Sequence, residues 1–144
     1  MEPLPDPNAR YSDLDGLARL LREHPESARV EWLQKAVPRS PFGGFFLARR
    51  VRLRRSAARR LVESTVELSN VSTVQWWLEF YGHVCGLRRA LMMLDEWRLT
   101  RPEMFKSASY WVGKLPGIHS PEGKKVHAEF VARWAKPLTR EENR

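Results

Sequence analysis

The sequence has very little cysteine, and this scarcity excludes a whole class of stabilised scaffold. Its 144 residues contain one cysteine, Cys85, so no internal disulfide can form. A disulfide-rich secreted scaffold is therefore excluded, and a reducing compartment is favoured. The first ten residues, MEPLPDPNAR, carry three prolines and two acids before any apolar run, unlike a secretory signal or a transit peptide. We expect a cytoplasmic or nuclear protein that is not secreted.

The sequence also has no uninterrupted hydrophobic run suited to a membrane. Its most apolar region, residues 74–94, contains four ionisable side chains, Glu79, His83, Arg88 and Arg89. Each such group near the middle of a bilayer costs about 2.5 kcal/mol or more. We therefore expect no membrane span and place residues 74–94 in the core of a folded domain.

Motifs with catalytic or metal-binding specificity are missing as well. Residues 117–125, GIHSPEGKK, only loosely resemble a phosphate loop, because the glycines are one residue too far apart and no strand precedes them. None of the four histidines pairs with a cysteine or a carboxylate at a zinc-ligand spacing; they are His24, His83, His119 and His127. We expect no catalytic residue, no metal site and no cofactor, and hence a non-enzymatic protein.

What the sequence does contain is helical periodicity. Apolar residues recur at three- and four-residue spacing, whereas the alternation typical of strands never persists. With prolines, glycines and caps as boundaries, we predict an all-α fold of about six helices. The predicted helices cover residues 13–24, 25–37, 45–68, 73–99, 102–112 and 121–136, with Ser12 or Asp13 and Ser72 as N-caps, Asn70 as a terminator and RSPFGG, residues 39–44, as a loop. A flexible arm, 1–10, and a flexible tail, 138–144, flank a single helical domain, 11–137.

The predicted helix 73–99 is apolar around most of its circumference. Its narrowest apolar arc contains Trp76, Phe80, Val84, Leu87, Leu91 and Leu94. A helix of this kind is surrounded by other helices, so it should be the largely buried centre of the bundle. Gly82 and Gly86 lie four residues apart on its remaining face. They either allow a neighbouring backbone to approach closely or are two unrelated glycines.

The strongest feature is a stretch of positive charge without any acid inside it. Eight arginines occur between positions 39 and 60, and the net charge of the whole chain is also +8. On one continuous helix, with about 100° per residue, five of them share an arc of about 140°. The five are Arg49, Arg52, Arg55, Arg59 and Arg60. Arg50 and Arg54 fall on the apolar side, where they either reach Glu79, Asp95 or Glu96 or extend to the edge of the core.

The five-arginine face predicts a surface that binds phosphates. Guanidinium groups bind phosphate oxygens in a bidentate manner, and such contacts position a protein on nucleic acid without recognising its sequence. Stacking of guanidinium planes on bases suits RNA in particular. The alternatives are a solvated helix face, a surface for acidic proteins or membranes, and a nuclear-import signal. We expect binding to RNA or DNA through Arg49, Arg52, Arg55, Arg59 and Arg60, with low sequence specificity.

Two side-chain sets within the helices have competing interpretations. The six tryptophans mostly fall on apolar stripes and are predicted to be core residues. Trp97 lies apart from these stripes, next to the polar arc, and is the one expected to contact a partner. Glu79 and His83 are four residues apart, which suits either acid–base chemistry or a local stabilising contact.

Residues 67–87, ELSNVSTVQWWLEFYGHVCGL, resemble the first homology region of Bcl-2-type apoptosis regulators. In both, an acidic-leucine start precedes a turn and an aromatic-rich helix containing glycine. The Asn-Trp-Gly-Arg core of that region and a hydrophobic C-terminal anchor are not found here. The resemblance implies a protein-interaction or regulatory module with a helix-binding groove beside the central helix, which is the alternative to nucleic-acid binding. The sequence indicates no oligomeric state.

Overall fold

The computed structural model describes residues 2–9, 11–66 and 73–136, and within these ranges it contains helices and no strand. The prediction of an all-α fold is therefore confirmed. The α-helices are α1 Leu14–Arg22, α2 Glu26–Ala36, α3 Pro41–Arg50, α4 Arg55–Val66, α5 Val74–Cys85, α6 Leu87–Thr100, α7 Pro102–Ser109 and α8 Pro121–Trp134, and a short 3-10 helix covers Val112–Lys114. Eight helices replace the expected six because two of the expected helices are each divided.

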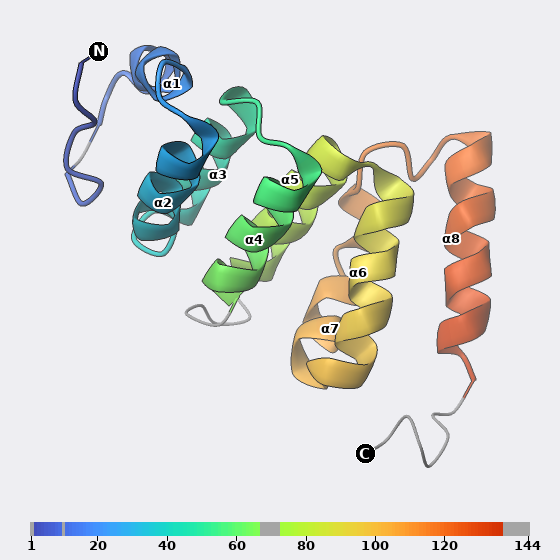
Figure 1. The fold of residues 1–144 in the computed structure, drawn as a ribbon. Helices are drawn as coiled ribbons and strands as arrows, with labels where there is room; N and C mark the ends of the chain where they lie inside the picture. The colour runs from blue at the N-terminus through green and yellow to red at the C-terminus, as the bar shows by residue number, and fades with distance from the viewer. Residues whose placement is uncertain (1, 10, 67–72, 137–144) are drawn as a thin grey trace.

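The helices stand side by side in a row, with α1 to α3 at one end and α8 at the other (Figure 1). In the middle of this row, α5 packs against α3, α4, α6 and α7. Trp77, Leu78 and Phe80 of α5 are buried. Only the first half of the predicted helix 73–99 therefore belongs to the helix that packs against these four neighbours. Helices α4, α6 and α8 all begin at the same edge of the row, the upper edge in Figure 1.

Gly86 divides the predicted helix 73–99 into α5 and α6. Its φ of 92° and ψ of 163° belong to a region that is open essentially to glycine alone. Gly82 has a different role, because a Cβ there would lie 2.7 Å from Cδ2 of Leu115. The close approach at Gly82 is thus made by the side chain of Leu115 and not by a neighbouring backbone as predicted, whereas Gly86 serves the bend.

The predicted helix 45–68 is also wrong as a single element. Residues 51–54 form a non-helical turn between α3 and α4, and Arg52 in this turn has a φ of 56°. Val51 and Leu53 are buried on either side of Arg52, so burial of two apolar residues offsets the unfavourable φ. Helix α3 in turn begins at Pro41, inside the segment expected to be a loop, because proline suits the first turn of a helix.

Several helix boundaries follow from the sequence as expected. The Asp13 side chain accepts a hydrogen bond from the Gly16 amide and caps α1. Pro102 and Pro121 occupy the first turns of α7 and α8. The expected terminator Asn70, the expected cap Ser72 and the tail 138–144 lie outside the described residues.

Two tryptophans are fully buried at the centre of the row. Trp77 of α5 and Trp97 of α6 pack edge to face, with ring centroids 6.4 Å apart. Trp97 is 1% exposed, so the prediction that it contacts a partner is wrong. Its polar neighbours in the sequence are bound at the α6 surface, where Arg98 donates to Lys136 O and Asp95 pairs with Arg133.

Across the described ranges, no helix is long and apolar enough to cross a membrane.

The bend at Gly86 generates a stability prediction. Gly86→Ala should lower the free energy of unfolding by about 1–3 kcal/mol, because alanine is strained at this φ and ψ. Gly113→Ala is the matched control, since an added Cβ meets nothing within 4 Å at either position and only Gly86 has a positive φ. The control should change stability by less than about 0.5 kcal/mol in denaturant unfolding. Equal effects of the two substitutions would contradict the role of Gly86.

Candidate nucleic-acid interface

The turn at residues 51–54 presents two arginines to solvent from a buried base. Val51 and Leu53 are buried, and Arg52 and Arg54 between and after them are exposed. The alternation in the letters VRLR therefore marks a short extended turn inside a region that otherwise has helical spacing. Since its apolar residues are anchored in the core, the turn holds both guanidinium-bearing residues at fixed points of the surface.

Two side chains of α2, Arg29 and Glu26, bind the backbone of this turn. Arg29 donates from Nη1 to Val51 O at 2.9 Å, and it also donates to His24 O at 2.8 Å and Arg22 O at 3.1 Å. The backbone amide of Arg54 donates to Oε2 of Glu26 at 2.9 Å. One backbone carbonyl and one backbone amide of the turn are thus bound by α2. The Glu26 carboxylate also lies at the start of α4, where negative charge is favourable.

The ends of α3, α5 and the starts of α4 and α6 bring further arginines to the same edge (Figure 1). Nη2 of Arg49, near the end of α3, lies 2.9 Å from Nε2 of His83 in α5. The charges of Arg55 and Arg89 both act on the Cys85 thiol at the end of α5. We define the arginine edge by these side chains and the turn; it consists of Arg49, Arg52, Arg54, Arg55 and Arg89, all exposed.

The members of the arginine edge are not neutralised by acids. Among the described residues, none of the five has a carboxylate within ion-pair distance, although other arginines of the chain do have such partners. Arg60 is likewise exposed and lies farther along α4. Four of the five predicted site residues are therefore exposed, namely Arg49, Arg52, Arg55 and Arg60.

Arg59, the fifth predicted site residue, is held inside the protein surface. Its guanidinium pairs with Glu63 at 2.7 Å and with Glu96 of α6, and its Cζ lies 5.8 Å from the centroid of the Tyr81 ring. Burial alone would lower the pKa of Arg59, but hydrogen bonds to Glu63, Glu96 and Tyr81 raise it above its ordinary value. Arg59 therefore joins α4 to α5 and α6, and we remove it from the interface.

Arg50 reaches a carboxylate on a neighbouring helix, as one of the two alternatives predicted, but the acid is none of the three that were expected. Arg50 pairs with Asp15 of α1 at 2.5 Å, and its Cζ lies 4.3 Å from the centroid of the Phe46 ring. Arg54 is exposed in the turn. The division of the helix moves both residues away from the positions that a continuous helix would give them. Of the acids expected to bind them, Glu96 binds Arg59 and Asp95 binds Arg133.

Two titratable side chains near the arginine edge, His83 and Cys85, have pKa values shifted in favour of their uncharged forms. Burial lowers the pKa of His83, and the charge of Arg49 lowers it further. Since arginine only donates hydrogen bonds, Nε2 of His83 accepts the bond from Arg49. Burial raises the pKa of Cys85 despite a hydrogen bond to Tyr81 and the nearby arginines, so the thiol stays protonated and weakly nucleophilic. Glu79 accepts a hydrogen bond from Gln75 at 3.3 Å and His83 is bound by Arg49, so the predicted pair of Glu79 with His83 is not supported.

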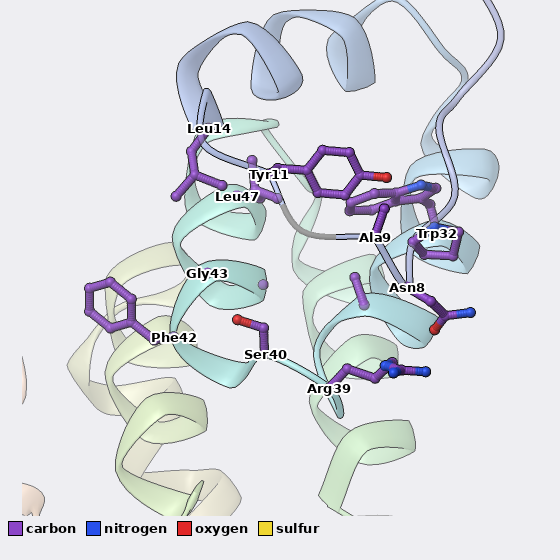
Figure 2. A pocket seen from close by; sticks show the side chains of 13 residues that line it. Asn8, Ala9, Tyr11, Leu14, Trp32, Arg39, Ser40, Phe42, Gly43 and Leu47 are labelled. Atoms are coloured by element: carbon purple, nitrogen blue, oxygen red, sulfur yellow. The ribbon is translucent and has the colours of Figure 1, made fainter.

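A separate cleft of about 560 Å³ lies between the N-terminal arm, α2 and the first half of α3 (Figure 2). Tyr11, Trp32 and Arg39 are among its lining residues, and none comes from α5. It is therefore not the groove beside the central helix that the resemblance implies. Within the ranges that the structure describes, no three histidines, cysteines or acids gather as a metal site would require.

The chain matches no family model, no curated protein and no solved structure with which it was compared. The arrangement of its own residues is therefore what bears on function. Sequence reasoning missed Glu26, Arg29 and Arg89, which shape or extend the arginine edge. The alternation at 51–54 was the only available signal, because the partners of Glu26 and Arg29 are distant in sequence.

The contact between Arg49 and His83 predicts a lowered titration midpoint for the His83 imidazole. In an NMR titration, His83 should have a midpoint below its ordinary value of 6.5, and Arg49→Gln should raise that midpoint part of the way. Because the unfolded chain binds this proton more readily, stability should fall as pH decreases below 6.5, until folded His83 is also protonated. Arg50→Gln removes the same charge next in sequence and should leave the midpoint unchanged. A wild-type midpoint at or above 6.5 would contradict the contact.

The hydrogen bonds of Arg29 predict a local effect on the turn. Arg29→Gln should lower the free energy of unfolding by about 1–2 kcal/mol, because backbone carbonyls at three sites lose a charged donor. Amide exchange at Arg54 should become faster, since the turn is released from α2. Arg19→Gln, at an exposed position on α1, is the control and should leave both measurements unchanged. Unaltered exchange at Arg54 in the Arg29 variant would count against the clamp.

Proposed function

We propose that this chain binds RNA or DNA through the arginine edge, by contacts to phosphates and with low sequence specificity. The single observation that supports the proposal is the clamped turn, in which Arg52 and Arg54 are exposed on a buried base and their guanidinium groups have no carboxylate partner among the described residues. Because the turn is already ordered, these side chains reach an anion without a further loss of backbone entropy. Arg49, Arg55 and Arg89 extend the positive surface on both sides.

Low sequence specificity is proposed because no recognition element accompanies the arginines. A helix that enters a major groove presents polar side chains to base edges along one face. The helix at the centre of this fold, α5, is instead buried by its neighbours. Contacts made by side chains at helix ends and in a turn suit the phosphate backbone, where affinity depends on salt.

Reversal of charge on the arginine edge tests this function. The triple variant Arg52→Glu, Arg54→Glu and Arg55→Glu should bind mixed-sequence DNA and RNA probes at least tenfold more weakly. The slope of log affinity against log salt concentration should fall by about 2–3 units, about one for each phosphate that the variant no longer binds. Fluorescence anisotropy at several salt concentrations measures both quantities.

The control variant changes the net charge equally at scattered exposed positions, by Arg19→Glu, Lys106→Glu and Lys136→Glu. It should retain most of the affinity and nearly the wild-type slope. The proposal fails if the triple variant binds as well as the wild type. It also fails if the control loses as much affinity as the triple variant, since net charge alone would then explain binding.

A protein-interaction module is the second candidate, favoured by one exposed aromatic residue beside the central helix. Phe42 is 62% exposed and packs edge to face on Trp76 of α5, with ring centroids 5.3 Å apart. An exposed aromatic residue of this kind suits an apolar partner surface. A protein captured by the wild type in high salt, and no longer captured by Phe42→Ser, would support this candidate over nucleic-acid binding.

A further inference from the structure

The N-terminal arm, residues 2–9, lies on the domain although it contains no helix or strand. Three side chains of the domain bind its backbone carbonyls. Nε2 of His24 lies 2.7 Å from Glu2 O, and Trp32 donates from Nε1 to Pro5 O at 2.8 Å. The Tyr11 hydroxyl donates to Asp6 O. Because a carbonyl only accepts, His24 must carry its proton on Nε2.

These contacts recognise the backbone of a proline-rich segment and not its polar side chains. Pro3, Pro5 and Pro7 restrict φ and lack amide hydrogens, so the carbonyls are the groups that such a segment offers for hydrogen bonding. The rings of Tyr11 and Trp32 lie together, with centroids 6.1 Å apart, and form an aromatic surface beside the arm. Aromatic rings combined with donors to carbonyls are a recurrent way to bind extended proline-rich peptides.

The cleft beside this surface offers room that the arm does not use. At Asp6 the arm turns back, because the Asp6 side chain accepts from the Asn8 amide and Asp6 O accepts from the Ala9 amide. The cleft continues past this turn along Leu14, Leu47 and Phe42 (Figure 2). Its only charged lining residue is Arg39, which has no acid partner in the part of the chain that the structure describes.

We propose that Tyr11, His24 and Trp32 form a binding site for a proline-rich segment of a partner protein, and that the arm occupies this site within the chain. The partner's segment makes the same carbonyl contacts and continues into the cleft, where an acidic residue pairs with Arg39. The additional contacts are needed because a tethered arm competes at an effective concentration on the order of millimolar. This site is separate from the arginine edge, since Arg39 and Arg49 lie at opposite ends of α3.

Peptide binding to the full chain tests the site. The probes are an acetylated peptide of residues 2–9 and the same peptide with Pro7→Glu and Asn8→Glu. The protein is the wild type and a full-length Pro3→Gly/Pro5→Gly variant, whose arm loses the proline restriction and leaves the site more readily. Fluorescence anisotropy of the peptides, labelled at the C-terminus, reports occupancy of the site. We expect the glycine variant to bind both peptides at least tenfold more tightly than the wild type, and the acidic peptide more tightly than the parent.

Three control variants make the outcome decisive. Trp32→Phe keeps an aromatic but smaller ring and loses the donor, so peptide binding should be abolished while circular dichroism stays unchanged. Arg39→Gln should remove only the advantage of the acidic peptide. A peptide with Pro3→Ala and Pro5→Ala should bind more weakly than the parent. If the glycine variant fails to fold, the wild type at high protein concentration should still bind the labelled peptides saturably.

The proposal is overturned if neither the glycine variant nor the wild type binds the labelled peptides saturably. It is also overturned if the Trp32→Phe variant binds the peptides as tightly as its parent. A concentration-dependent dimer in which each arm occupies the other copy's site would replace a partner protein with a second copy of this chain as the occupant.

Discussion

The fold depends on one constraint, which is that arginines and core residues alternate within the same short stretch. The segment from Arg39 to Arg60 supplies eight positive charges and also buried residues such as Val51, Leu53 and Ala57. A single straight helix would bring Arg50 and Arg54 to the side of the core, where an unpaired charge is very unfavourable. The turn at 51–54 resolves this conflict, because it returns the apolar residues to the core and leaves the arginines in water.

Helix α2 holds the turn at 51–54 in place through two partly buried charged residues, Glu26 and Arg29. Arg29 and Glu26 bind opposite backbone groups of the turn, and Arg29 also binds the end of α1. Arg59 likewise connects two helices, because its guanidinium joins α4 to Glu96 of α6. The positive charge of the segment is thus divided between arginines that hold helices together and arginines that remain available to an anion.

The sequence was sufficient for the helical class and for a cap at Ser12 or Asp13, of which Asp13 caps α1. These features depend on local spacing and on proline and glycine, which act within a few residues. The two breaks were missed because the apolar spacing on either side happens to continue a helix. The helix breaks at Gly86 because this residue has a φ of 92°. A glycine in a sequence does not indicate which backbone conformation it adopts.

The site was harder to predict than the fold, for a related reason. The exposure of Arg49, Arg52, Arg55 and Arg60 follows from their polar character, and the sequence placed them correctly at the surface. That Arg59 is paired with acids, and that Arg89 belongs to the arginine edge, depend on helices that meet only after folding. No spacing rule within one helix connects Arg59 with Glu96, or Arg55 with the end of α5, because these pairs are separated by about thirty residues or more in the sequence.

The common direction of α4, α6 and α8 has an electrostatic consequence. Each helix carries a macrodipole equivalent to roughly half a positive charge at its first turn, where backbone amides have no helical partner. Since all three helices begin at the edge where α3 and α5 end, positive and negative ends of helix dipoles meet there (Figure 1). The dipoles of α3 and α5 therefore offset those of α4 and α6. The positive potential of this edge comes from its arginine side chains and not from the backbone.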